Sequence, residues 1–215
     1  ELTGGTPDLA PVNDGFPLSD PTAILEDLQN RMQQDFPALA DLTAQTVQCD
    51  IQDVDAGLEA YSIPAWYMIP PIDALMQNTI RINRSSTADG IELYTTLAHE
   101  GYPGHLYQTV YFREHTHNPL AALLTCSGAN EGWATYVEQL SYFYDNDLSE
   151  ENSAYQAAMR SFSLCFHSLL DIGINYDGWS KDRAAAFVRT CFDADDALVE
   201  ELWQTMIDNP TNYME

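Results

Sequence analysis

The local fold is decided by the stretch AHEGYPGH at residues 98–105, which places two histidines and a glutamate within seven residues. In the common H-E-x-x-H pattern the histidines lie one turn apart and share a helical face. Here His99 and His105 are six residues apart, and a regular helix would turn the second about 120° away from the first. Pro103 disfavours helix in the preceding residue, and Gly104 permits turns that other residues resist. The sequence therefore predicts one helix ending before the proline and another beginning near His105, with the two imidazoles brought together.

A second segment, NEGWATYVE at residues 130–138, offers a third metal ligand. A catalytic zinc ion usually has three protein ligands and one open position. Glu131 and Glu138 are seven residues apart on one helical face, and two acids on a largely apolar helix are costly to bury without a cation. We predict that Glu131 is the ligand and that Glu138 either orients a ligand side chain without binding the metal itself or is solvated. Glu100 directly follows a histidine and is expected to act as the general base.

The composition excludes several classes of function. The chain has 33 acidic and 8 basic residues, a formal charge of −25, which argues against nucleic-acid binding and against docking on anionic membranes. No apolar run is long enough to span a bilayer. The acidic surface solubilises the chain, attracts cationic substrates or reflects an adaptation to salt, and composition does not separate these alternatives. Four widely spaced cysteines predict no disulfide framework, and Cys165 and Cys191 are predicted as buried free thiols.

The periodicity of apolar residues predicts a mainly α-helical fold with a small, antiparallel β-sheet. Asp20 and Pro21 are typical of a helix start, and Pro37 is expected to end that helix. Short alternating runs predict strands near residues 47–51, 63–69 and 79–83, and helical spacing predicts helices near 105–115, 119–144, 150–173, 180–191 and 194–208. We expect an irregular segment plus helix over residues 1–44 and a metal-binding domain over residues 45–215.

The two motif segments together resemble the bacterial domain-of-unknown-function family 885, whose pattern is H-E-x-x-P-G-H followed by E-G-W-A-x-Y. Stretches at residues 171–175, 178–180 and 209–213 are also similar. The family is regarded as metallopeptidase-like and related to the gluzincins, zinc peptidases with a His, His, Glu ligand set. The resemblance implies a gluzincin-like helical catalytic region in which His99, His105 and Glu131 hold zinc and Glu100 is the base.

The resemblance also implies roles for residues near the end of the chain. Asp171 would orient a ligand histidine through a hydrogen bond. Asn175 stands where many members of the family have histidine, which puts proton transfer at that position in doubt. Tyr213 is a candidate for stabilising an oxyanion. Family chains extend beyond both ends of the region resembled here, and the sequence lacks an initiator methionine; we therefore expect a fragment of a longer chain.

Three functions are compatible with these residues. The first is a zinc-dependent peptidase, in which metal-activated water attacks a peptide carbonyl with Glu100 as general base. The second is a zinc hydrolase of non-peptide amides or esters, because the ligand set does not fix the bond that is broken. The third is a non-enzymatic metal-binding or relict domain. Compartment is left open, and peptide is the expected substrate of the first function.

Overall fold

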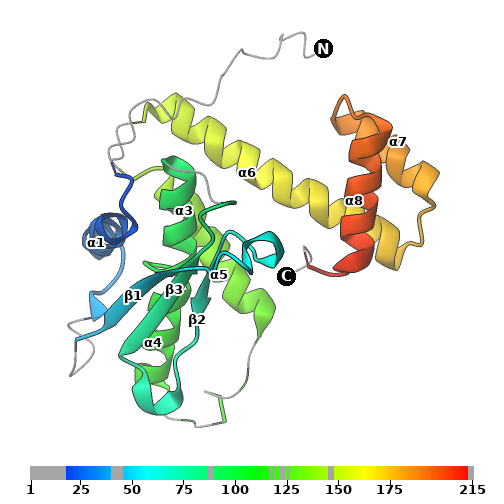
Figure 1. Cartoon of the computed structure of the whole chain (residues 1–215). Coiled ribbons are helices and arrows are strands. Elements are labelled where there is room, and N and C mark those ends of the chain that lie inside the picture. Colours follow the sequence, from blue (N-terminus) through cyan, green and yellow to red (C-terminus); the bar gives the residue numbers. More distant parts are fainter. Residues whose placement is uncertain are drawn as a thin grey trace. The chain divides into compact units, whose positions relative to one another are not determined.

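The computed structural model describes residues 18–39, 46–86, 90–116, 118, 120–121, 124, 126–144 and 148–212. The fold is mainly helical, with a small mixed sheet of three strands (Figure 1). The helices are α1 Pro21–Arg31, α3 Ile91–Glu100, α4 His105–His115, α5 Ser127–Ser141, α6 Glu150–Asp171, α7 Lys181–Cys191 and α8 Asp196–Asp208. No described helix is long and apolar enough to cross a membrane.

The contacts divide the chain into two compact units. The first comprises Glu1–Cys126 and Asn130–Ala154, and the second comprises Ser127–Ala129 and Tyr155–Glu215. The domain boundary expected at residue 44 stays a prediction.

The sheet has the strand order β1-β3-β2, with β1 at Gln48–Asp53, β2 at Ala65–Met68 and β3 at Gln77–Ile82. Strand β2 is antiparallel to β3, whereas β1 is parallel to it, so the prediction of an antiparallel sheet was wrong for one of the two pairings. The chain leaves β1, reverses to form the edge strand β2, and then turns back to insert β3 between them. Two reversals of direction make the first and last strands parallel.

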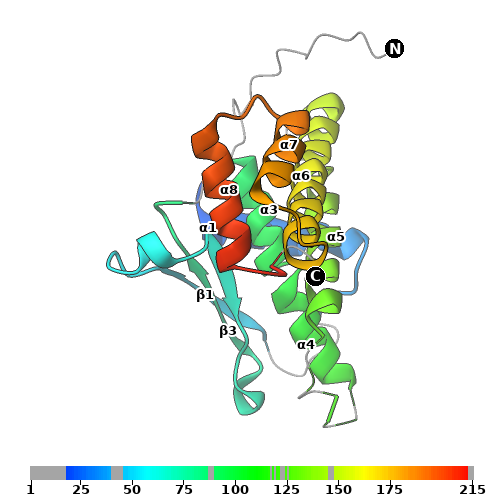
Figure 2. The same cartoon turned by 90° about the vertical axis from the view of Figure 1, so that its right-hand side faces the viewer.

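Helix α3 lies deep in the first unit. It packs against α1 and β2, and Leu93, Tyr94, Leu97 and Ala98 are almost fully buried. In both views the helices α3 and α4 lie on one face of the sheet (Figures 1 and 2). Because the helix is enclosed on several sides, the polar side chain at its end, Glu100, is buried as well.

Helix α1 begins as the sequence predicts. The Asp20 side chain accepts a hydrogen bond from the Ala23 N–H at 2.9 Å, and proline occupies the first turn. The α-helix ends at Arg31 and tightens into a 3-10 turn at Met32–Gln34, earlier than the predicted end at Pro37. The first two turns bury Ile24, Leu25 and Leu28, while Pro37 disfavours helical geometry in the residue before it.

The second unit has its own apolar core. Helix α6 continues into a π-helical segment, Ile172–Tyr176, before α7 and α8. Side chains from all four segments fill the core: Phe166, Leu170, Ile174, Ala184, Ala185, Val188, Val199 and Met206. The helices predicted over residues 150–173, 180–191 and 194–208 are confirmed within a few residues, whereas the one predicted over 119–144 is shorter, because α5 begins at Ser127.

The cysteines correct one prediction. Cys165 and Cys191 are free, but both are exposed rather than buried. Near Cys165, the buried positions of α6 include Phe166 and Leu170. One residue is about 100° around a helix, which turns Cys165 away from the core. Cys191 is the last residue of α7, past the last buried turn.

Candidate metal centre

The two histidine-bearing helices are separated by a tight four-residue break. Helix α3 ends at Glu100 and α4 begins at His105, which confirms the break predicted from the proline and glycine. Glycine is required at both ends of this loop. A Cβ at Gly104 would overlap the backbone carbonyl of His99, and one at Gly101 would lie 2.5 Å from Leu25 Cδ2. The absence of side chains lets α4 start directly against the end of α3.

This break brings the two imidazoles together. The ring centroids of His99 and His105 are 4.8 Å apart, with the ring planes at 85°. Glu131, on α5, lies against both rings: one carboxylate oxygen is 3.4 Å from His99 Nε2 and the other is 3.4 Å from His105 Nε2. The three residues selected from the sequence as ligands therefore face one another.

The spacing of these atoms suits a small tetrahedral cation. Zinc binds imidazole nitrogen and carboxylate oxygen at about 2.0–2.2 Å, so two tetrahedral ligands lie about 3.3–3.5 Å from each other. The two distances between Glu131 and the imidazole nitrogens are both 3.4 Å. Among the described residues, His99, Glu100 and His105 also form a group in which each offers one potential ligand atom within 4.8 Å of the others. The donor set of two imidazoles and a carboxylate could hold zinc.

Glu100 is held differently from Glu131. Its side chain is buried, and its Oε2 accepts a hydrogen bond of 2.7 Å from the backbone N–H of Tyr67 on β2. Burial raises the pKa of the Glu100 carboxyl above its usual value, against the opposing charges of His99 and His105. A raised pKa makes a carboxylate a stronger base, which suits a group that accepts a proton beside a metal site.

The charges of the cluster are coupled. The second ring nitrogen of His99, Nδ1, lies 3.0 Å from Glu138 Oε2. Burial by itself lowers the pKa of His99, but the contacts with Glu131 and Glu138 outweigh burial and raise that pKa to about 9. In turn, hydrogen bonds with His105 and His99 hold the pKa of the Glu131 carboxyl well below its usual range. Without a metal ion, a proton on His99 balances the surrounding carboxylates.

The role of Trp133 was not predicted from the sequence. Its indole Nε1 donates a hydrogen bond of 2.8 Å to the carbonyl of Pro103, and its ring packs edge-on against Phe36, with centroids 5.6 Å apart. Helix α5 thus contacts the 99–105 segment through three side chains: Glu131, Trp133 and Glu138. The E-G-W spacing was the available signal, because it places the tryptophan two residues from the ligand.

Two further predicted site residues, Asp171 and Asn175, belong to the second unit. Asp171 is buried, and its Oδ1 accepts a hydrogen bond of 2.7 Å from Asn175 Nδ2, which also donates to the Met206 carbonyl at 3.0 Å. These contacts lie within the second unit, and the roles predicted for Asp171 and Asn175 stay predictions. Tyr213 lies outside the described residues.

With this geometry in view, the family can be stated. Residues 11–213 match the family described as "Bacterial protein of unknown function (DUF885)", and the chain belongs to that bacterial family. A crystal structure from Colwellia psychrerythraea, of a protein provisionally described as a lipoprotein, is similar to it with a TM-score of 0.64 and 19% sequence identity. The similarity covers 94% of this chain and 37% of that one, so the chain spans little more than a third of the solved protein. No curated protein matches. At this identity the likeness supports the fold alone.

Proposed function

We propose that the chain carries the catalytic region of a gluzincin-like, zinc-dependent peptidase. The observation that supports this best is the position of the Glu131 carboxylate, whose two oxygens lie 3.4 Å from His99 Nε2 and 3.4 Å from His105 Nε2. The buried carboxyl of Glu100 lies close to the same two histidines. Two imidazoles and a carboxylate, with a further acid next to them, form the set of groups that metal-assisted hydrolysis uses.

Glu131 is the better third ligand and Glu100 the better base. Glu131 is within 3.4 Å of both imidazole nitrogens and its low pKa keeps it ionised. Glu100 is committed to a hydrogen bond with the Tyr67 N–H, and its raised pKa suits a group that cycles between its two protonation states. A bound zinc ion would acidify water and polarise the scissile carbonyl. Glu100 would accept the proton of the attacking water and pass it to the leaving amine.

The edge strand favours a peptide over other amides and esters. In an antiparallel pair, alternate residues direct their backbone groups toward the partner strand or away from it. Pro64 faces β3, since its carbonyl accepts from the Asn83 N–H, so Ala65 and Tyr67 direct their backbone groups to the free edge of β2. At this edge, which is buried at both residues, the Tyr67 N–H donates to Glu100. An extended peptide pairing with this edge would present its carbonyls beside Glu100.

The test compares hydrolysis and metal binding in Glu100→Gln. The full chain is loaded with zinc and assayed against matched peptide and ester substrates. We expect peptide hydrolysis to fall at least about 100-fold in the variant, the range typical of losing a general base, while the zinc content stays at the wild-type level. Glu114→Gln, at an exposed position on α4, is the matched control and should change neither quantity. Equal rates of peptide hydrolysis by Glu100→Gln and the wild type would contradict the role of Glu100 as general base. Hydrolysis of esters but not of peptides would contradict the proposal that the substrate is a peptide.

A further inference from the structure

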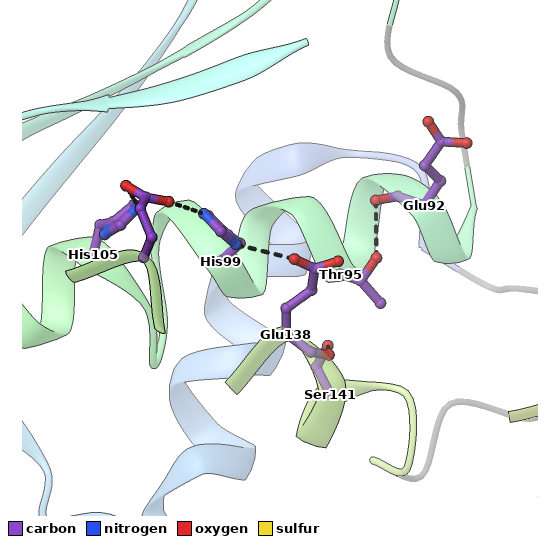
Figure 3. Close-up of polar contacts among 7 residues, drawn as sticks. Glu92, Thr95, His99, His105, Glu138 and Ser141 are labelled. Carbon is purple, nitrogen blue, oxygen red and sulfur yellow. Dashed lines mark hydrogen bonds and ion pairs between the residues drawn. The ribbon is translucent and has the colours of Figure 1, made fainter. Parts of the chain in front are cut away.

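We infer that Glu138 is the positioning residue for His99: it fixes which ring nitrogen carries the proton and directs the other nitrogen to the metal. The inference rests on the metal site of the proposed function and concerns how that site is held, not what it hydrolyses. It starts from the contact between Glu138 Oε2 and His99 Nδ1 at 3.0 Å (Figure 3).

The position of Glu138 on its helix needs an explanation. The inward stripe of α5 consists of the positions that the structure buries: Ala134, Val137, Glu138 and Ser141. Glu138 is only 4% exposed. A carboxylate at such a position is strongly unfavourable unless a cationic or hydrogen-bonding partner compensates for its lost hydration. His99 supplies that partner from α3.

The ring of His99 is held at both nitrogens from one helix. Glu138 meets Nδ1 at 3.0 Å and Glu131 lies 3.4 Å from Nε2. The two glutamates are separated by two turns of α5, so they bracket the imidazole and fix the orientation of its plane. His105 is the first residue of α4, and its Nε2 lies 3.4 Å from the other Glu131 oxygen.

The chemistry of imidazole makes this contact decisive for metal binding. A neutral ring carries one N–H and one lone pair. A carboxylate at Nδ1 selects the tautomer with the proton there, which leaves the lone pair at Nε2, on the side of His105 and Glu131. The negative charge of Glu138 also makes the ring a stronger electron donor.

Zinc affinity measures this role without reference to turnover. The chelator-treated full chain is titrated with zinc in competition with a chromophoric chelator, for wild type, Glu138→Gln and Glu92→Gln. Removing the charge at Glu138 while keeping its shape should weaken zinc binding about 10- to 100-fold. Glu92 lies on the same helix as His99 but is exposed, so Glu92→Gln should bind as the wild type does. An unchanged affinity in Glu138→Gln would overturn the inference while leaving the zinc site intact.

A second measurement needs no variant and therefore does not depend on how Glu138→Gln folds. Nitrogen-15 spectra of the zinc-loaded wild type report the state of each imidazole nitrogen. We expect the proton of His99 on Nδ1 and the metal on Nε2. Zinc on Nδ1 of His99 would overturn the assignment. Failure of the wild type to bind zinc at all would overturn both the inference and the proposed function, so the outcomes are distinguishable.

Discussion

The indole N–H of Trp133 donates a hydrogen bond of 2.8 Å to the carbonyl of Pro103. This contact joins the helix that bears Glu131 to the loop between His99 and His105, so it fixes the third ligand relative to the other two. Its loss should loosen the site rather than unfold the chain.

Trp133→Phe tests this connection. The phenyl ring keeps much of the packing against Phe36, but the hydrogen bond is lost and a buried carbonyl loses its partner, which costs about 1–2 kcal/mol. We expect zinc affinity to fall roughly 3- to 30-fold, measured by chelator competition. Phe36→Leu is the control, because it disturbs the same packing contact without removing the hydrogen bond. If Phe36→Leu weakens zinc binding as much as Trp133→Phe does, the hydrogen bond has no special role.

Gly104→Ala tests the break between the helices. The new Cβ would overlap the backbone carbonyl of His99, and backbone atoms cannot move aside as a flexible side chain can. We expect a loss of at least about 3 kcal/mol in the free energy of unfolding, measured by urea denaturation, comparable with the largest effects of single substitutions.

Gly132→Ala is the matched control for this substitution. Gly132 lies within α5, and a Cβ there meets nothing within 4 Å. Alanine in a helix is favoured over glycine by about 0.5–1 kcal/mol, so this variant should be as stable as the wild type or more so. Equal stabilities of Gly104→Ala and Gly132→Ala would show that the close approach of α3 and α4 is not required.

Gly104 and the proline before it illustrate what the local sequence could predict. The break at residues 101–104 and the start of α4 follow from short-range chemistry, because proline and glycine act on their immediate neighbours. The starts of α7 and α1 depend on short-range chemistry too: the side chains of Ser180 and Asp20 accept hydrogen bonds from N–H groups three residues later.

Other features depend on contacts between distant segments, which local patterns do not encode. The parallel pairing of β1 with β3 depends on which strand occupies the centre of the sheet. The burial of Glu138 depends on how α5 is rotated against α3, and two readings of that residue remained open from the sequence. The hydrogen bond of Trp133 was not predictable either, because nothing in its own segment reveals that its N–H reaches Pro103.

The stability of the metal-free chain should depend on pH through His99. Its pKa is raised from 6.5 to about 9 in the folded chain. A raised pKa contributes stability that is fully present below the unfolded value of 6.5 and is lost as pH rises through about 9. We therefore expect the free energy of unfolding of the chelator-treated chain to fall between these values, by on the order of 2–3 kcal/mol. Urea denaturation at a series of pH values measures it.

Glu138→Gln provides the comparison for this pH dependence. Removing one of the two carboxylates that raise the pKa of His99 should make the decline in stability with pH smaller, whereas Glu92→Gln should leave it unchanged. At acidic pH the dependence has the opposite sign. The pKa of Glu131 is lowered in the folded chain, so its carboxylate contributes stability above its unfolded-state pKa of 4.5, and that stability is lost as the pH falls. A stability that rises between neutral pH and pH 9 would contradict the charge assignment of the cluster.

The central claim is that His99, His105 and Glu131 together hold one zinc ion. The most direct measurement is an anomalous difference map, recorded on either side of the zinc absorption edge, from crystals of the full chain grown with zinc. We expect a single strong peak about 2.0–2.2 Å from His99 Nε2, His105 Nε2 and a Glu131 oxygen. Zinc bound elsewhere, or no peak between the two imidazoles in zinc-containing crystals, would contradict the account.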